Sequence, residues 1–207
     1  MLASPWERNM YFKIITILFM LPAFTSTMTI NSEKDRLALV EKIIKAGRRS
    51  QASTAMSFSG DPRTYEVMND NLKLEDGTYL PFTIIDARRI AKAWNCTIPR
   101  LEKLRAIAEH AYLSGNQLKA QTYLPNDRAQ RYLNSNKMMK SKEMQRRSQL
   151  GNTQLIDGHF KWYTNDGKIW GFAKGDGTFY HNWPSGRHRS DRSYFDYSHG
   201  VRLICPN

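Results

Sequence analysis

The chain has 207 residues and a formal net charge of +12 at pH 7, because 31 Lys and Arg side chains stand against 19 Asp and Glu side chains. This length allows one or two small domains, and 41% apolar residues are enough to form a core. The sequence contains no Walker loop, no Gly-x-Ser-x-Gly and no His-Glu-x-x-His motif, and its cysteines and histidines lack zinc-site spacing, so no metal and no other cofactor is predicted. The positive charge favours a polyanionic partner, such as nucleic acid, lipopolysaccharide, anionic lipid or an acidic polymer, and a basic surface without a specific partner is the alternative.

Residues 10–27 have the order of a secretory signal peptide. Lys13 supplies a positive charge, residues 14–24 are apolar apart from Thr16, and small residues follow. The apolar run is shorter than the roughly 20 residues that span a membrane. We therefore predict that residues 1–27 are a cleaved signal peptide, with Met10 as an alternative start, and that the mature protein is secreted or periplasmic without a stable transmembrane segment. An uncleaved anchor and a buried helix are the alternatives.

Residues 28–115 are predicted to be a mainly helical region. Residues 32–35 have the form of a capping box with Ser32 as the cap, apolar residues then recur at helical spacing, and Gly47 marks the end of this first helix. The polar and small residues at 50–62 predict a loop. The Asp-Gly pair within 69–82 predicts the turn of a short hairpin.

Two more helices are predicted on either side of a turn at 95–97. Asp86 is the expected cap of the first helix and Thr97 the expected cap of the second. This spacing resembles a helix-turn-helix, so a DNA-binding protein is one alternative function, and a structural helical hairpin has the same pattern. The basic side chains along it that suit phosphate contacts are Arg88, Arg89, Lys92, Arg100, Lys103 and Arg105.

Residues 116–157 are predicted to form a basic connector. The segment is rich in Gln, Asn, Arg, Lys and Met, and it supplies few apolar contacts. Because charged runs are usually solvated, we expect a solvated, partly helical connector, and a basic arm that follows a polyanion is the alternative.

Residues 158–207 are predicted to form an aromatic-rich antiparallel β region. Two Asp-Gly pairs, at 166–167 and 176–177, separate aromatic runs, as in a small meander of hairpins. The predicted fold class is therefore α+β, with an N-terminal helical layer packed against a small C-terminal antiparallel β-meander.

A binding surface is predicted on this β region and on the cationic loop Arg187–Arg192. Arginine binds phosphate in a bidentate manner, and aromatic side chains on the neighbouring sheet would complete the surface. The favoured function is an exported basic binding protein that engages an anionic polymer, an envelope component or another extracellular partner through this sheet and loop. A solvated loop is the alternative. The candidate binding residues are Arg187, His188, Arg189, Arg192, Trp162, Trp170 and Trp183.

The first alternative function is a secreted, metal-independent ribonuclease or toxin that acts on RNA. That chemistry needs a base, an acid and cations on the phosphate, and the candidates are His181, His188, His199, Arg189 and Arg192. Residues 185–192 are similar to the Arg-bearing segment of barnase-like microbial ribonucleases, and they share Ser185, Gly186, Ser190, Asp191 and Arg192 with it. The resemblance implies a catalytic histidine on a following strand, which only His199 can supply. It also implies a glutamate base, which is missing after Gly158 unless His181 replaces it.

Cys96 and Cys205 are predicted to form a disulfide. Val201, Leu203 and Cys205 alternate onto one face of the last predicted strand, so Cys205 should point toward the core, where Cys96 lies on the helical layer. An export signal would place the chain where disulfides persist.

Overall fold

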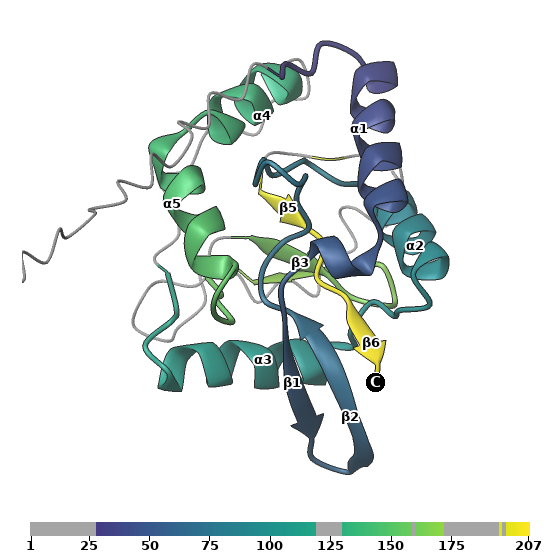
Figure 1. The fold of residues 1–207 in the computed structure, drawn as a ribbon, viewed down its shortest axis with the longest axis vertical. Helices are drawn as coiled ribbons and strands as arrows, with labels where there is room; N and C mark the ends of the chain where they lie inside the picture. The colour runs from purple at the N-terminus through teal and green to yellow at the C-terminus, as the bar shows by residue number, and fades with distance from the viewer. Residues whose placement is uncertain (1–27, 119–129, 159, 172–194, 196–197) are drawn as a thin grey trace, which may run out of the picture.

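A computed structural model describes residues 28–118, 130–158, 160–171, 195 and 198–207 (Figure 1). The predicted signal peptide lies outside these residues. The helices are α1 (Glu33–Ala46), η1 (Arg48–Ser50), α2 (Ile84–Ala93), α3 (Leu101–Leu113), α4 (Arg131–Met139) and α5 (Lys142–Gly151). The strands are β1 (Ser53–Phe58), β2 (Asp61–Met68), β3 (Lys161–Tyr163), β4 (Ile169–Gly171), β5 (His199–Gly200) and β6 (Ile204–Pro206). The fold is α+β, as predicted, and within the described ranges no helix is both long and apolar enough to cross a bilayer.

The strands form two small sheets rather than one meander. In the first sheet the order is β1-β2-β6, and both pairings are antiparallel. In the second sheet β3 pairs antiparallel with β4 across the predicted Asp166-Gly167 turn, and it pairs parallel with β5. The last strand therefore leaves the C-terminal region and joins a hairpin from the first third of the chain. In Figure 1 this hairpin projects past α3, while α1 and α2 lie on one side of the second sheet and α4 and α5 on the other.

The hairpin β1–β2 occupies much of the segment that the sequence predicted as a loop, so the prediction for 50–62 is wrong. The inward face of the hairpin packs on α3 in a small apolar cluster, and Gly60 takes a φ of 76° in the turn. The members of that cluster are Phe58, Tyr65, Val67, Ile107, Leu155 and Ile204. The second predicted hairpin, within 69–82, is present in a short form, as a bridge between Lys73 and Tyr79.

The helix caps agree only in part with the predictions. Ser32 caps α1, and its side chain accepts a hydrogen bond from the Asp35 amide. For α2 the cap is Thr83, and Asp86 is its capping-box partner three residues later, so the prediction of Asp86 as the cap is wrong. The third predicted helix was to start after Thr97, but α3 starts at Leu101 because Thr97 pairs with β6 instead.

Helices α4 and α5 replace the solvated connector that the sequence predicted. Their inner faces are buried and contribute to the main core, so the prediction of a solvated segment is wrong for 131–151. The reason is that methionines fill gaps in the core as flexible apolar side chains, although they lie in a run dominated by charge. The apolar residues buried here are Met138, Met139 and Met144.

Candidate functional site

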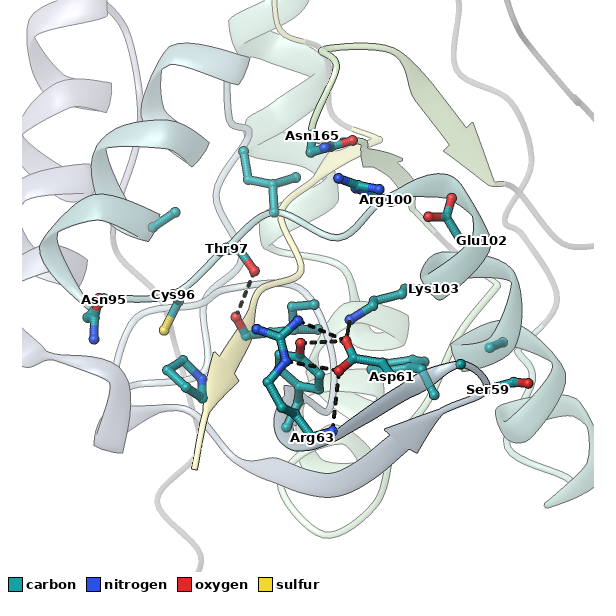
Figure 2. Close-up of a pocket in the computed structure, with 18 of the residues that line it drawn as sticks. Ser59, Asp61, Arg63, Asn95, Cys96, Thr97, Arg100, Glu102, Lys103 and Asn165 are labelled. Atoms are coloured by element: carbon teal, nitrogen blue, oxygen red, sulfur yellow. Dashed lines mark hydrogen bonds and ion pairs between the residues drawn. The ribbon is translucent and has the colours of Figure 1, made fainter.

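A broad groove of about 1010 Å³ lies between the β1–β2 hairpin, α2, the start of α3 and β6 (Figure 2). Its apolar lining includes Phe58, Ala91, Ile98, Ala106 and Ile204. Its charged lining is mostly basic, and consists of Arg63, Arg88, Lys92, Arg100 and Lys103 with the acidic residues Asp61 and Glu102.

Asp61, at the start of β2, is fully engaged by its neighbours. Its carboxylate accepts hydrogen bonds from Arg63 Nε at 2.9 Å, from Lys103 Nζ at 2.8 Å and from Tyr65 Oη at 2.6 Å. These bonds, first from Arg63 and then from Lys103, hold the pKa of Asp61 well below its usual range. Figure 2 shows Arg63 and Lys103 converging on Asp61 from the hairpin and from α3. This acidic group is therefore neutralised inside the groove.

Lys103 also ties the hairpin to α3. Its ammonium lies 3.9 Å from the centroid of the Tyr65 ring and 4.7 Å from that of Phe58. A cation over aromatic faces in a partly buried position stabilises their contact, so Lys103 and Asp61 together form the link between β2 and α3.

Three further cations of the groove are exposed. Arg88 and Lys92 lie four residues apart on α2 and thus on one helical face, and Arg100 is the N-cap residue of α3. Within the part of the chain that the structure describes, none of these three side chains makes an ion pair or a hydrogen bond. Because Asp61 is already neutralised, the groove presents a net positive surface that an anionic group can reach.

The walls of the groove are joined by backbone and covalent bonds. The Thr97 amide donates to the Ile204 carbonyl at 2.8 Å, and the Ile204 amide donates back to Thr97 at 3.0 Å. Beside this pair, Cys96 and Cys205 form the predicted disulfide, with Cα atoms 4.2 Å apart. The connection between α2 and α3 is thereby held against β6. These bonds fix the relative positions of the helices that carry Arg88, Lys92 and Arg100.

This arrangement differs from a helix-turn-helix. The connection 94–100 is longer than the turn of about three to four residues in that motif, and it forms part of a β pairing. The structure nevertheless places four of the basic residues proposed for phosphate contacts on a single groove, namely Arg88, Lys92, Arg100 and Lys103. Arg63 was not predicted as a site residue, because nothing in the local sequence connects the hairpin to α3.

Two of the predicted binding tryptophans belong to the core. Trp162 and Trp170 are 1% and 4% exposed, so neither offers a ring face to a ligand on the surface. Trp162 Nε1 donates to Asp157 Oδ1 at 2.7 Å, which satisfies its polar atom inside the protein. Trp162 and Trp170 therefore contribute to the packing of the second sheet.

His199, a candidate for ribonuclease chemistry, is buried on β5. Its Nδ1 lies 3.0 Å from Tyr163 Oη, and that hydroxyl donates to the Phe82 carbonyl at 3.0 Å. Since the hydroxyl has one proton, His199 Nδ1 must be the donor to Tyr163. The other candidates lie outside the described residues, and they are Trp183, His181, Arg187, His188, Arg189 and Arg192.

Among the described residues, no group of three or more His, Cys, Asp and Glu side chains has an arrangement that would hold a metal ion. The lining of the groove offers hydrogen-bond donors and positive charge. No family model, no curated protein and no solved structure matches this chain.

Proposed function

We propose that the protein binds an anionic polymer, with phosphate or sulfate groups, along the groove between α2, α3 and the β1–β2 hairpin. The observation that carries the proposal is the set of three exposed cations, Arg88, Lys92 and Arg100, which lack carboxylate partners in the described structure. Each can contact an anionic group without first breaking an ion pair.

The exposure of the cations in the groove supports a polymer rather than a small ligand. Pockets for small molecules have volumes of roughly 300–1,000 Å³ and enclose most of their ligand. Here the volume of about 1010 Å³ lies at the upper end of this range, but the three cations Arg88, Lys92 and Arg100 are exposed, so an extended chain can reach all of them. The formal charge of +12 on the whole chain adds a long-range attraction that accelerates encounter with a polyanion.

The triple variant Arg88→Gln, Lys92→Gln, Arg100→Gln should bind heparin far more weakly than the parent protein. Each lost contact removes one released counterion, so for a flexible polyanion the slope of log K against log salt should become shallower by about 2. At 0.1 M salt this corresponds to a loss of about 100-fold in affinity. Fluorescence titration with labelled heparin over a series of salt concentrations measures both quantities.

The matched control removes the same number of charges elsewhere. Lys34, Lys42 and Lys137 are exposed, they lie on α1 and α4, and none of them lines the groove. Their triple Gln variant has the same net charge as the groove variant. Because it keeps the three groove cations, it should retain most of the affinity for heparin. Equal losses in both variants would show that binding follows net charge alone, and this outcome would contradict the groove as the site.

We further propose that the protein acts in an oxidising compartment after export. The Cys96–Cys205 disulfide supports this proposal, because such bridges persist outside the cytosol, and the leader-like order of residues 10–27 supports it as well. The mass of the protein purified from the medium or the periplasm tests it. That mass should lack residues 1–27 and the two thiol hydrogens.

A further inference from the structure

A second, smaller cavity shares no lining residue with the groove, and one of its lining residues is Lys73. The cavity has a volume of about 80 Å³ and is lined by the turn at Lys73–Tyr79, by Ser50, and by residues of α4 and α5. This is well above the roughly 10–15 Å³ that one water molecule needs, so a molecule of a few heavy atoms has room. Lys73 is 6% exposed, which is unusual for a lysine.

The ammonium of Lys73 is buried without a carboxylate bound to it. Lys73 Nζ donates to the backbone carbonyl of Ser148 at 2.8 Å, and it lies 5.8 Å from the centroid of the Tyr79 ring. Both Lys73 and Ser148 line the cavity. Lys103, by contrast, is bonded directly to Asp61.

The carboxylate of Asp70, which interacts electrostatically with Lys73, is occupied by other donors. Arg147 Nη2 donates to Asp70 Oδ1 at 2.5 Å, Arg147 Nε lies 3.0 Å from Oδ2, and the Tyr79 hydroxyl donates to the same Oδ2. Asp70 therefore acts on Lys73 only at a distance, and its charge is opposed there by that of Arg147. Glu75 and Asp76 also line the cavity, but they do not bond to Lys73.

We propose that Lys73 is a nucleophilic amine that condenses with small carbonyl compounds entering this cavity. The nitrogen lone pair forms a bond to the carbonyl carbon, and the carbonyl oxygen leaves as one water molecule with the two amine hydrogens. The product is an imine, and no oxidant or reductant takes part. A lysine that is removed from water next to another cation is the usual form of such a nucleophile.

The electrostatics of the site favour the neutral amine that this step needs. Burial is the largest effect and lowers the pKa of Lys73 to about 8, against the Asp70 charge, which raises the pKa, and with a smaller contribution from the Arg147 charge, which lowers it. At pH 8 about half of the Lys73 side chains are then neutral, against less than about 1% for a lysine with an ordinary pKa near 10.4.

In the experiment the folded protein is treated with acetaldehyde, which forms the imine, and with cyanoborohydride, which reduces the imine to a stable ethyl-lysine. Peptide mass spectrometry then locates each modified lysine. Lys73 should be modified first, at least about tenfold faster than the exposed Lys42 at pH 8, because the neutral fraction of an ordinary lysine is so small. The rate at Lys73 should rise with pH and level off above pH 8, whereas the rate at Lys42 should continue to rise. The Lys73→Arg variant should lose this first modification, and Lys42→Arg should keep it.

The decisive comparison is between the folded and the urea-unfolded protein without any substitution, since this comparison does not require a variant to fold. If Lys73 stays unlabelled in the folded protein but reacts after unfolding in urea, the amine is inaccessible and the proposal is overturned. Modification of Lys73 and Lys42 at equal rates in the folded protein would overturn it as well. This result is independent of heparin binding at the groove, so failure of one proposal leaves the other standing.

Discussion

Replacing Asp70 by Asn should lower the free energy of unfolding by about 3–5 kcal/mol, the usual cost of leaving one member of a buried ion pair without its partner. The Arg147 side chain is 0% exposed and that of Asp70 is 2% exposed, so water cannot take the place of the lost carboxylate. The pair is joined by Arg147 Nη2 at 2.5 Å and by Arg147 Nε, and the Tyr79 hydroxyl also depends on this carboxylate. Urea denaturation followed by circular dichroism should show a lower midpoint with an unchanged slope.

A double-mutant cycle separates the interaction energy of the Asp70–Arg147 pair from the contacts that each residue makes with its other neighbours. Arg147→Met removes the buried charge, so the double variant with Asp70→Asn should be markedly more stable than the sum of the two single losses would give. The exposed pair Glu41–Arg89 is the matched control, because both of its side chains are 43% exposed. Glu41→Gln should cost less than about 1 kcal/mol. A loss that small for Asp70→Asn would contradict the buried geometry of the pair.

The sequence could not have predicted that Arg147 is buried. Arg147 lies in a basic run that is typical of a solvated surface, and 77 residues separate it from Asp70. Hydrophobic periodicity identifies only the apolar face of a helix. A charged side chain can be buried in the core when a distant residue of opposite charge pairs with it and aromatic side chains pack against it. Here the Arg147 guanidinium also lies 5.0 Å from the centroid of Phe160. The burial of Arg147, together with that of the methionines, is why the prediction of a solvated segment was wrong for 131–151.

The β1–β2 hairpin shows a second limit of local patterns. The residues of β1, Ser53–Phe58, are mostly small or polar, and they satisfied the description of a loop. What organises them is pairing, since β2 pairs with β1 on one edge and with β6, from the end of the chain, on the other. The pairing of β2 with β6 joins segments more than a hundred residues apart, and such a pairing leaves little signal in the local sequence. The groove depends on this hairpin, so its full lining could not be predicted either.

Predictions that rested on local chemistry were more successful. The cap at Ser32 and the Asp166-Gly167 hairpin were both confirmed, because caps and tight turns depend on side chains a few residues apart, whereas the Asp35 carboxylate accepts from the Asn31 amide and so does not complete the predicted capping box. Of the six basic residues that the sequence proposed for phosphate contacts, Arg88, Lys92, Arg100 and Lys103 line the groove, and Arg89 and Arg105 do not. The predicted start of the third helix was wrong, since Thr97 pairs with Ile204 and α3 starts at Leu101.

The disulfide is the long-range feature that the sequence did predict, and its removal should have the other large effect on stability. Cys96 and Cys205 are 109 residues apart, so in the chain-entropy model the bridge restricts the unfolded chain enough to contribute about 4–5 kcal/mol. The double variant Cys96→Ala, Cys205→Ala should therefore unfold at a clearly lower urea concentration. The native protein should resist thiol alkylation until it is reduced, since the described chain has no free cysteine.

The same variant should leave the folded groove nearly unchanged. The two hydrogen bonds between Thr97 and Ile204 remain, and they hold the α2–α3 connection against β6 next to the former bridge. Because the disulfide acts mainly on the unfolded state, the loss should be seen in the unfolding midpoint and not in heparin affinity under native conditions. A fall in affinity at temperatures where the variant is fully folded would instead show that the bridge itself positions Arg88, Lys92 and Arg100. An unchanged midpoint would show that the backbone pairing alone already restricts this part of the chain.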